Sequence, residues 1–512
     1  MSEAVVIGVD VGTTATKAVA FDAQGAAHGS GEAGYPLLEP APGSAVQDPL
    51  AVLEAALSAL GAALPRGRAV AALCFSGAMH SLIGIGADDE PITELLTWAD
   101  SRAVAQAQRL RREHPDLHER TGTPVHPMAP LAKLVWFREC RPELFARVRR
   151  WVGIKELIVH RLTGEWVIDS SCASGTGLLS LARLEWDAEA LALAGIGADQ
   201  LSHVVPATET LALRGEVAGL ARGTALVVGA GDGPLANLGV GAVRPGVAAC
   251  SIGTSGALRM IVGEAAVDPA RQLFCYALTP GRWLIGGAIS NGGSVLEWAR
   301  SALAPELGTG SEARLLELAA GVPPGSEGLI ALPYLLGERA PHWDTIARGA
   351  YVGLRQSHGR AHLVRAAIEG VCQQLALVLA SIREAGREVS EIRATGGFAR
   401  SALWRQMLAD VLGMPVAFPA AHEGSAFGAA LLGMEALGIV ESIERAAELV
   451  QIEQTLAPEP GAAAAYAELR PLFAALYDEL APAFRALARS ERSGEDVDRG
   501  TEGPPPTIQG ET

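Results

Sequence analysis

Residues 7–17 read IGVDVGTTATK, and this stretch decides the fold. It begins as an apolar strand, places Asp10 inside that strand and turns on Gly12. A carboxylate lowers strand propensity, so an acid at this position indicates chemistry rather than packing. Gly12 has no Cβ and lets the backbone approach an anion closely. We interpret the stretch as a hairpin whose turn faces phosphate, although a tight hairpin with a solvated aspartate explains the same pattern.

The residues around this turn suit a bound phosphate. Thr13 and Thr14 offer hydroxyls and amides to phosphate oxygens, and Lys17 adds a positive charge. Asp10 beside phosphates is unfavourable unless a cation lies between them. Mg²⁺, which keeps several waters and takes one or two carboxylates, is the ordinary solution.

A related turn returns halfway along the chain, where residues 251–256 read SIGTSG. Aligning Gly12 with Gly253 also aligns three further pairs: Asp10 with Ser251, Thr13 with Thr254, and Thr14 with Ser255. The repeat predicts two related α/β domains, each offering one phosphate-facing hairpin to a shared cleft. Chance is the alternative, because Gly-Thr turns are common.

Length and composition set the class of protein. With 512 residues the chain exceeds what one hydrophobic core usually supports, and 49% hydrophobic residues are enough for large cores. A net charge of −16 opposes nucleic acid or an anionic membrane as partner. Six scattered cysteines, an N-terminus without a basic region and the absence of a long apolar run predict a cytoplasmic protein.

Strands that alternate with helices predict an α/β protein. The helix predicted over 47–64 has Asp48 as its N-cap and Pro49 as its first residue. Strands are predicted at 5–9, 18–21, 69–77, 225–229, 247–252, 283–286 and 391–395, and further helices at 361–385, 400–412 and 461–490. The polar residues after 487 predict a disordered tail.

The stretch VVGAGDGPLANLGVG (227–241) runs from a strand through Gly-Asp-Gly into an apolar helix. Asp232 is either the N-cap of that helix or a general base that accepts a proton from a sugar hydroxyl. The two interpretations are compatible, because active sites of α/β proteins lie where helices begin at the carboxyl edge of a sheet.

Two glycine pairs in the second half of the chain also lead into helices. EIRATGGFARSALW (391–404) contains Gly396, Gly397 and Ser401, and AISNGGSVLEW (288–298) contains Asn291 and Gly292. Glycines at a helix start leave room for phosphate or a nucleotide face. An α/β turn without a ligand explains each of these patterns in isolation.

Polar residues in the first half are candidate substrate contacts. They lie in FSGAMHSL (75–82), LLTWADSRA (95–103) and TGTPVHPMAPLAKLVW (121–136), and the candidates are Met79, His80, Trp98, Asp100 and Arg102. A lone histidine such as His80 or His126 is more often a packed core residue than a ligand. No His/Cys spacing fits zinc, and no Walker A sequence is present.

Together these motifs resemble the FGGY carbohydrate kinases of the actin-like ATPase superfamily. The resemblance spans residues 5 to 450 and rests on motifs in a fixed order: IGVDVGTTATK, GAMHS, LLTWADSRA, GAGDG, SIGTSG, GGFARSALWRQMLADVLGMPV and EGSAFGAALLG. It implies two duplicated RNase H-like domains flanking a deep cleft. The domains expected are a sugar-binding one over 1–245 and a nucleotide-binding one over 246–486, followed by a tail over 487–512.

The resemblance also implies a role for each candidate. Asp10 is expected to hold Mg²⁺ and Asp232 to be the catalytic base. Contacts to ATP are expected from Thr13, Thr14, Lys17, Gly253, Thr254, Asn291, Gly292, Gly396, Gly397 and Ser401. Contacts to the sugar are expected from Met79, His80, Trp98, Asp100, Arg102 and Asp232.

The stretch TGTPVHPMAPLAKLVWFRE is most similar to the gluconokinase branch, which makes D-gluconate the expected substrate and phosphorylation of its terminal hydroxyl the expected reaction. Met79-His80 is shared with xylulokinases, the alternative within the family. Because gluconate is an anion, a cationic partner is expected among Arg102, His126, Lys133 and Lys155. A non-catalytic actin-like nucleotide switch is the alternative outside enzymes, and a homodimer is compatible with the resemblance.

Overall fold

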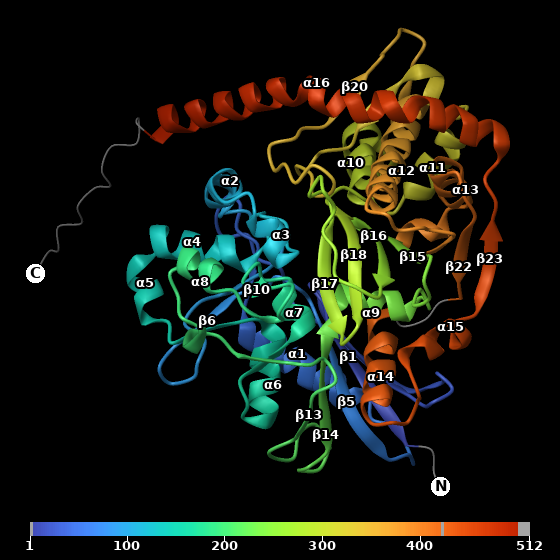
Figure 1. Ribbon diagram of the computed structural model, residues 1–512. Helices are drawn as coiled ribbons and strands as arrows, with labels where there is room; N and C mark the ends of the chain where they lie inside the picture. The colour runs from blue at the N-terminus through green and yellow to red at the C-terminus, as the bar shows by residue number, and fades with distance from the viewer. Residues whose placement is uncertain (1–3, 421–423, 500–512) are drawn as a thin grey trace, which may run out of the picture.

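The computed structural model describes residues 4–420 and 424–499, and Figure 1 shows two β-sheets, each flanked by helices. The first sheet has six strands in the order β13-β14-β5-β1-β2-β3. They are β1 (Val5–Val11), β2 (Ala15–Phe21), β3 (Ala27–Gly34), β5 (Val70–Gly77), β13 (Thr210–Ala212) and β14 (Ala225–Gly231). The apolar runs that predicted strands over 5–9, 18–21, 69–77 and 225–229 all lie in this sheet.

The second sheet has seven strands in the order β17-β18-β16-β15-β21-β22-β23. They are β15 (Val247–Ile252), β16 (Gly256–Val262), β17 (Phe274–Thr279), β18 (Arg282–Ile289), β21 (Glu391–Thr395), β22 (Val416–Pro419) and β23 (Ile452–Leu456). Strands β15, β18 and β21 contain the runs predicted at 247–252, 283–286 and 391–395.

The two sheets repeat one topology. β1 pairs antiparallel with β2 and parallel with β5, and β15 pairs in the same two ways with β16 and β21. The next neighbours repeat as well, since β14 is parallel to β5 and β22 is parallel to β21. The two Gly-Thr turns therefore occupy the same place in duplicated units, which confirms the predicted fold class of two related α/β domains.

The predicted helices form on the faces of these sheets. In α1 (Pro49–Ala62), Asp48 accepts a hydrogen bond from the Leu50 amide at 2.9 Å, which confirms the predicted cap. The helices predicted at 361–385 and 400–412 are α12 (Arg360–Glu384) and α13 (Ala402–Leu412). α12 is long and apolar enough to cross a membrane, but 83% of its apolar window is buried in the protein, as in a core helix.

Two helices lie where the duplicated units meet. α9 (Asp232–Gly239) follows the first sheet, and α14 (Gly424–Ala436) follows β22 yet packs on β1 and on α9. The approach is close: a Cβ on Gly8 would lie 1.8 Å from the carbonyl oxygen of Ala426, and one on Gly428 would lie 2.1 Å from that of Leu235. Residues 424–433 of the EGSAFGAALLG motif therefore form the joint between the two halves.

Small helices and strands surround the two sheets. On the first half these are α2 (Val104–Glu113), α3 (Leu117–Thr121), α4 (Pro130–Cys140), α5 (Pro142–Arg147), α6 (Ile154–Thr163), α7 (Ser170–Ser174), α8 (Ala188–Ala194), β4 (Val46–Gln47), β6 (Ile83–Ile85), β7 (Leu95–Leu96), β8 (Arg150–Val152), β9 (Val167–Asp169), β10 (Leu179–Ser180), β11 (Glu185–Trp186) and β12 (His203–Val205). On the second half they are α10 (Ser294–Leu303), α11 (Glu312–Ala320), α15 (Ala446–Leu449), β19 (Ile330–Leu332) and β20 (Ala350–Val352).

The last helix, α16 (Pro460–Arg499), crosses the second half and extends past it, as the red helix in Figure 1 shows. Residues 487–499, predicted to be disordered, continue this helix, and residues 500–512 lie outside the described part. Phe473 and Phe484 are buried against Tyr334. This packing anchors α16 to the segment that follows β19.

Candidate active site

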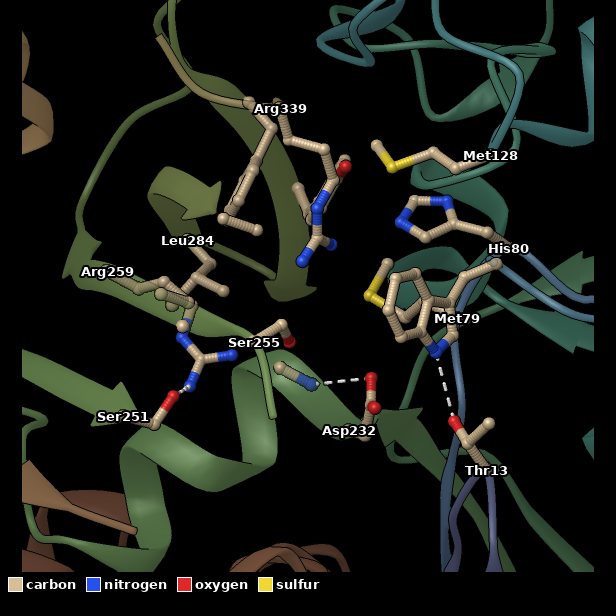
Figure 2. Close-up of a pocket in the computed structure, with 17 residues that line it drawn as sticks. Thr13, Met79, His80, Met128, Asp232, Ser251, Ser255, Arg259, Leu284 and Arg339 are labelled. Atoms are coloured by element: carbon tan, nitrogen blue, oxygen red, sulfur yellow. Dashed lines mark hydrogen bonds between the residues drawn. The ribbon is translucent and has the colours of Figure 1, made fainter. Parts of the chain in front are cut away.

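A cavity of about 290 Å³ lies between the two halves and is lined by both Gly-Thr hairpins (Figure 2). Thr13 comes from the first hairpin, and Ser251, Ser255 and Gly256 come from the second. The remaining lining residues are Met79, His80, Trp98, Met128, Asp232, Gly233, Ala257, Arg259, Phe274, Tyr276, Leu284, Ala288 and Arg339. The pairing of the two hairpins across one cavity is the arrangement that the repeat predicted.

Asp232 lies at the floor of this cavity as the first residue of α9. The N-cap is Gly231, so the interpretation of Asp232 as the N-cap is wrong by one position. Its Oδ1 accepts a hydrogen bond from the Gly233 amide at 2.8 Å. Loss of solvation raises the pKa of Asp232, while the charge of Arg259 opposes the rise. The result is a carboxylate with more affinity for a proton than an exposed aspartate has.

Asp10 lies near the end of β1, and β5 separates β1 from β14, the strand that leads to Asp232. Asp10 is opposite Lys17 in the hairpin register, and its Oδ1 accepts a hydrogen bond from the Ser76 hydroxyl at 2.6 Å. Burial raises the pKa of Asp10 to about 6, the Ser76 hydrogen bond lowers it, and the nearby charge of Asp232 raises it further. Two carboxylates that repel one another in this way are a suitable place for a divalent cation.

The described residues contain no group of three or more His, Cys, Asp or Glu side chains placed to hold a metal. This agrees with a magnesium ion that keeps waters and takes its other ligands from a substrate's phosphates, because Mg²⁺ needs only one or two protein carboxylates in such sites. Asp10 fits that role by its position beside the phosphate-facing turn.

A hydrogen bond from Trp98 to a hydroxyl connects the first hairpin to another residue of the cavity lining. Thr13 Oγ1 accepts a hydrogen bond from Trp98 Nε1 at 3.0 Å, whereas Thr14 is exposed. The second hairpin is fixed from behind, since the Gly293 and Gly292 amides donate to the carbonyls of Gly253 (2.6 Å) and Thr254 (3.0 Å). Glycines are required there because a Cβ on Gly292 would lie 2.7 Å from Ser255 backbone atoms.

The glycine pair at 396–397 adjoins the second hairpin. Gly396 has φ of 117°, and a Cβ there would lie 2.2 Å from the Ile252 carbonyl oxygen. Gly397 is exposed at the start of a 3₁₀ turn. Two predicted nucleotide contacts have structural partners instead: Ser401 caps α13 through the Trp404 amide, and the buried Asn291 side chain bonds Gly337, Glu338 and Leu336.

Four predicted substrate contacts line the cavity: Met79, His80, Trp98 and Asp232. His80 has φ of 67°, and burial lowers its pKa to about 3, so the imidazole is neutral. Its Nδ1 lies 2.7 Å from the carbonyl oxygen of Gly175 and therefore carries the proton. The Nε2 atom is then an acceptor suited to a sugar hydroxyl.

The structure does not bring Asp100 and Arg102 into the cavity. Asp100 is buried, accepts a hydrogen bond from the Ala45 amide and forms an ion pair with Arg102 at 2.8 Å. The Arg102 guanidinium lies over the ring of Trp136 at 4.6 Å. Both side chains hold the loop that carries Trp98, so their motif predicted the neighbourhood of the site and not direct contacts.

The other three candidates for a cationic partner are also absent from the cavity lining. Lys133 donates to the carbonyls of His80 (2.6 Å) and Thr97 (2.7 Å), and Lys155 forms a buried ion pair with Asp169 at 2.6 Å. His126 packs edge-on against Trp343 with a ring separation of 5.8 Å. These three side chains therefore contact neighbouring residues of the protein and do not line the cavity.

Two arginines that the sequence analysis missed line the cavity instead. Arg259 extends from β16, where a single charge interrupts the apolar run GALRMIV, and Arg339 comes from the loop LLGERAPHWD after β19. A lone arginine in an apolar strand was a usable signal for Arg259. Nothing local marks Arg339, because its place depends on packing between segments far apart in sequence.

Comparisons with known proteins agree with this geometry. The family model described as "FGGY family of carbohydrate kinases, N-terminal domain" matches residues 5–239, and the corresponding C-terminal domain model matches residues 248–437. The two matches together cover most of the chain, and each contains one of the two hairpins.

Relatives and solved structures match over nearly their whole length. A gluconokinase of Bacillus subtilis (strain 168) is 41% identical over 484 residues, which are 91% of this chain and 94% of the relative. A gluconate kinase structure from Lactobacillus acidophilus superposes with a TM-score of 0.89 at 36% identity, covering 95% of this chain and 100% of that one. A ligand-bound xylulose kinase structure from the same species has a TM-score of 0.88 at 36% identity, covering 94% and 99%.

Proposed function

Because the chain belongs to the FGGY family of carbohydrate kinases, we propose that it transfers the γ-phosphoryl group of ATP to the terminal hydroxyl of D-gluconate, giving 6-phosphogluconate. It is an ATP-dependent carbohydrate kinase; the particular sugar is the proposal. The two solved structures cited above are equally identical to the chain, so overall similarity to them does not select between gluconate and xylulose.

The charge of the cavity supports gluconate. Its lining contains two arginines, Arg259 and Arg339, and one acid, Asp232, and the other lining side chains are neutral. A site that excludes water strengthens the field of such a surplus charge. A substrate that carries one carboxylate balances the charges of the lining, whereas neutral xylulose leaves two arginines facing one acid across the cavity.

In the proposed reaction Asp232 accepts the proton of the terminal hydroxyl as its oxygen attacks the γ-phosphorus. The new O–P bond forms while the bond from the γ-phosphorus to the β,γ-bridging oxygen breaks, and ADP leaves. The raised pKa of Asp232 brings its proton affinity closer to that of the reacting group. General base catalysis of this kind typically contributes ~10²–10⁴-fold.

The two hairpins supply positioning and charge neutralisation, which dominate phosphoryl transfer. We assign Thr13, Thr14 and Lys17 to the γ-phosphate side, and Gly253, Thr254 and Gly292 to the opposite side of the phosphates. Gly396 and Gly397 adjoin the second hairpin and leave room for the nucleotide. Mg²⁺ held by Asp10 would neutralise the phosphate oxygens when bound.

The six unpaired cysteines fit the cytoplasm that we propose as the setting.

The test is a coupled ADP-release assay with Mg-ATP against D-gluconate, D-xylulose, L-ribulose, glycerol and erythritol. We expect turnover on gluconate to exceed that on each neutral substrate. If turnover were highest on xylulose, the kinase activity would stand and gluconate would be rejected as the substrate. ATP binding without transfer to any of the five would favour a nucleotide switch.

A further inference from the structure

Arg339 places a guanidinium inside the cavity with most of its bonding capacity unused. The residue is buried, at 8% exposure, and its Nη2 donates to the Ile289 carbonyl at 2.8 Å. Its Nε atom has no hydrogen-bond partner among the described residues. A buried donor without a partner is costly, and a bound ligand is one way to satisfy it; the Nε of Arg259 in the same cavity also lacks a partner among the described residues.

The faces and edges of this guanidinium are not equivalent. One face lies over the ring of Trp98 at 4.8 Å, as a cation–π contact between the two halves of the protein. The edge is what remains for a ligand, and a guanidinium edge is a planar fork that matches a carboxylate in a bidentate way. Figure 2 shows this edge directed into the cavity, toward the space between His80 and Ser255.

The neighbouring carboxylate does not fill this role. Glu338 is buried, and its Oε1 accepts from the backbone amides of Ser290 and Arg339, while its Oε2 accepts from the Asn291 side chain at 3.1 Å. These bonds fix the backbone of the loop and leave the Arg339 guanidinium without an ion pair to Glu338. The charge of Glu338 still acts on Arg339 through space, but the unused N–H groups of the guanidinium are available to a substrate.

The second arginine in the cavity belongs to the reacting end. Arg259 donates to the Ser251 hydroxyl at 3.2 Å, and a Cβ on Gly233 would lie 3.2 Å from its Nη1. Arg259 thus lies beside Asp232 and the second hairpin, where the proton and the phosphoryl group are transferred. The carboxylate of a sugar acid lies at the opposite end of the carbon chain from the hydroxyl that reacts, which leaves Arg339 as its partner.

Contacts from two helices, α16 and α2, hold the loop of Arg339 in place. His342 stacks on Tyr477 of α16 with a ring separation of 3.6 Å, and the Tyr477 hydroxyl donates to Asp344 at 2.8 Å. From the first half, Arg111 of α2 donates to the Trp343 carbonyl at 2.8 Å. Such support is what a binding group needs if it is to recognise one ligand geometry.

We propose that Arg339 is the specificity-determining residue that binds the carboxylate of a sugar-acid substrate through the edge of its guanidinium. The proposal rests on the proposed function, since it concerns the same cavity and the same substrate class. It assigns acid recognition to a loop of the C-terminal half, whereas the sugar hydroxyls contact the first half.

The experiment compares two ligands that differ only at one end. D-Gluconate and D-glucitol share every hydroxyl except that a CH₂OH group replaces the carboxylate. Their dissociation constants are measured by titration calorimetry, which requires no turnover, for the wild type and for the variants Arg339→Gln and Arg339→Lys. The control is Arg282→Gln, which removes an arginine that pairs with Glu435 and Glu444 and does not line the cavity.

We expect Arg339→Gln to weaken gluconate binding by at least about 10-fold and glucitol binding by less than about threefold, because a hydrogen bond to a charged partner is lost only with gluconate. Arg339→Lys keeps the charge but loses the planar fork, so its gluconate affinity should lie between those of the wild type and Arg339→Gln. Arg282→Gln should bind both ligands as the wild type does. The lysine variant also serves if the glutamine variant folds poorly.

Equal losses for both ligands would show that Arg339 only shapes the loop, and would overturn the proposal. A wild type that binds gluconate no better than glucitol would overturn it as well. The proposed function is judged separately, by turnover: a wild type that phosphorylates gluconate while Arg339→Gln weakens both ligands equally keeps the function and loses this assignment. Preference for gluconate in binding without turnover would reject the function alone.

Discussion

The indole Nε1 of Trp98 donates a hydrogen bond to the hydroxyl of Thr13 at 3.0 Å, and this bond connects the residues that we assign to the sugar with the hairpin that we assign to the phosphates. The same indole lies under Arg339, so one side chain contacts the groups assigned to both ends of the substrate. A substitution can therefore remove the N–H donor to Thr13 and keep the aromatic ring that contacts Arg339.

Trp98→Phe keeps an aromatic face for Arg339 and removes the donor to Thr13. We expect kcat to fall roughly fivefold, because one hydrogen bond contributes about 1 kcal/mol. A double-mutant cycle with Thr13→Val isolates the pair. Losses that add without coupling would show that the hydrogen bond does not orient the hairpin.

Asp232→Asn keeps the size of the side chain and removes the ability to accept a proton. The turnover number should fall by at least about 10²-fold. The fold should not suffer: the pKa of Asp232 is raised, so its ionised form destabilises the folded state at neutral pH, and the thermal midpoint of unfolding should stay or rise. Near-normal turnover in a folded variant would remove Asp232 from the role of base.

Magnesium dependence should follow the ionisation of Asp10. Its pKa of about 6 means that the carboxylate is protonated as the pH falls through 6, and a protonated Asp10 is a poor ligand. The apparent KM for Mg²⁺ should therefore rise below pH 6. Ser76→Ala removes a hydrogen bond that lowers this pKa, so the rise should begin at higher pH. Parallel pH profiles for variant and wild type would contradict the assignment of Asp10.

Arg259→Gln tests the electrostatic control of the base. The charge of Arg259 lowers the pKa of Asp232, so its removal raises that pKa and moves the acid limb of kcat/KM to higher pH. The matched comparison is Arg282→Gln, which removes an arginine that pairs with Glu435 and Glu444, does not line the cavity and should leave this limb in place. An unmoved limb in Arg259→Gln would show that Arg259 does not act on Asp232.

The sequence predicted those parts of the fold and site that depend on local patterns. The strands around Asp10 and Ser251 are apolar runs bounded by glycine turns, and the same turn occurring twice was enough to predict the duplication that the strand pairing confirms. Asp232 was recognisable because a strand, a Gly-Asp-Gly turn and a helix follow one another directly.

The rest depends on contacts between distant segments. Lys133 was assigned to the substrate by charge and motif, but its ammonium group bonds two carbonyls and is fully buried. Arg339 reaches the cavity through contacts between distant segments, among them the hydrogen bond from the Ser290 amide to Glu338, its neighbour in the loop. The helical stretch 487–499 was missed because its polar composition gives no apolar stripe, and the helix before it is fixed by Phe473 and Phe484.

The two glycines at 396 and 397 give a paired test of backbone conformation. Gly396 has φ of 117°, and a Cβ would lie 2.2 Å from the Ile252 carbonyl oxygen, so Gly396→Ala combines strain with a clash against a strand that cannot move. We expect a loss of about 2–4 kcal/mol in the free energy of unfolding. Gly397→Ala meets no atom within 4 Å and has no positive φ, so its unfolding should match the wild type.

The same pair separates stability from nucleotide binding. Because Gly397 is exposed beside the second hairpin, a methyl group there protrudes toward the space that we assign to ATP. Denaturant unfolding of both variants measures stability, and titration of ATP into Gly397→Ala measures nucleotide binding. A stable Gly397→Ala with weakened ATP binding supports the nucleotide assignment, whereas unchanged ATP binding places the nucleotide elsewhere. A Gly396→Ala variant as stable as the wild type would contradict the close approach to Ile252.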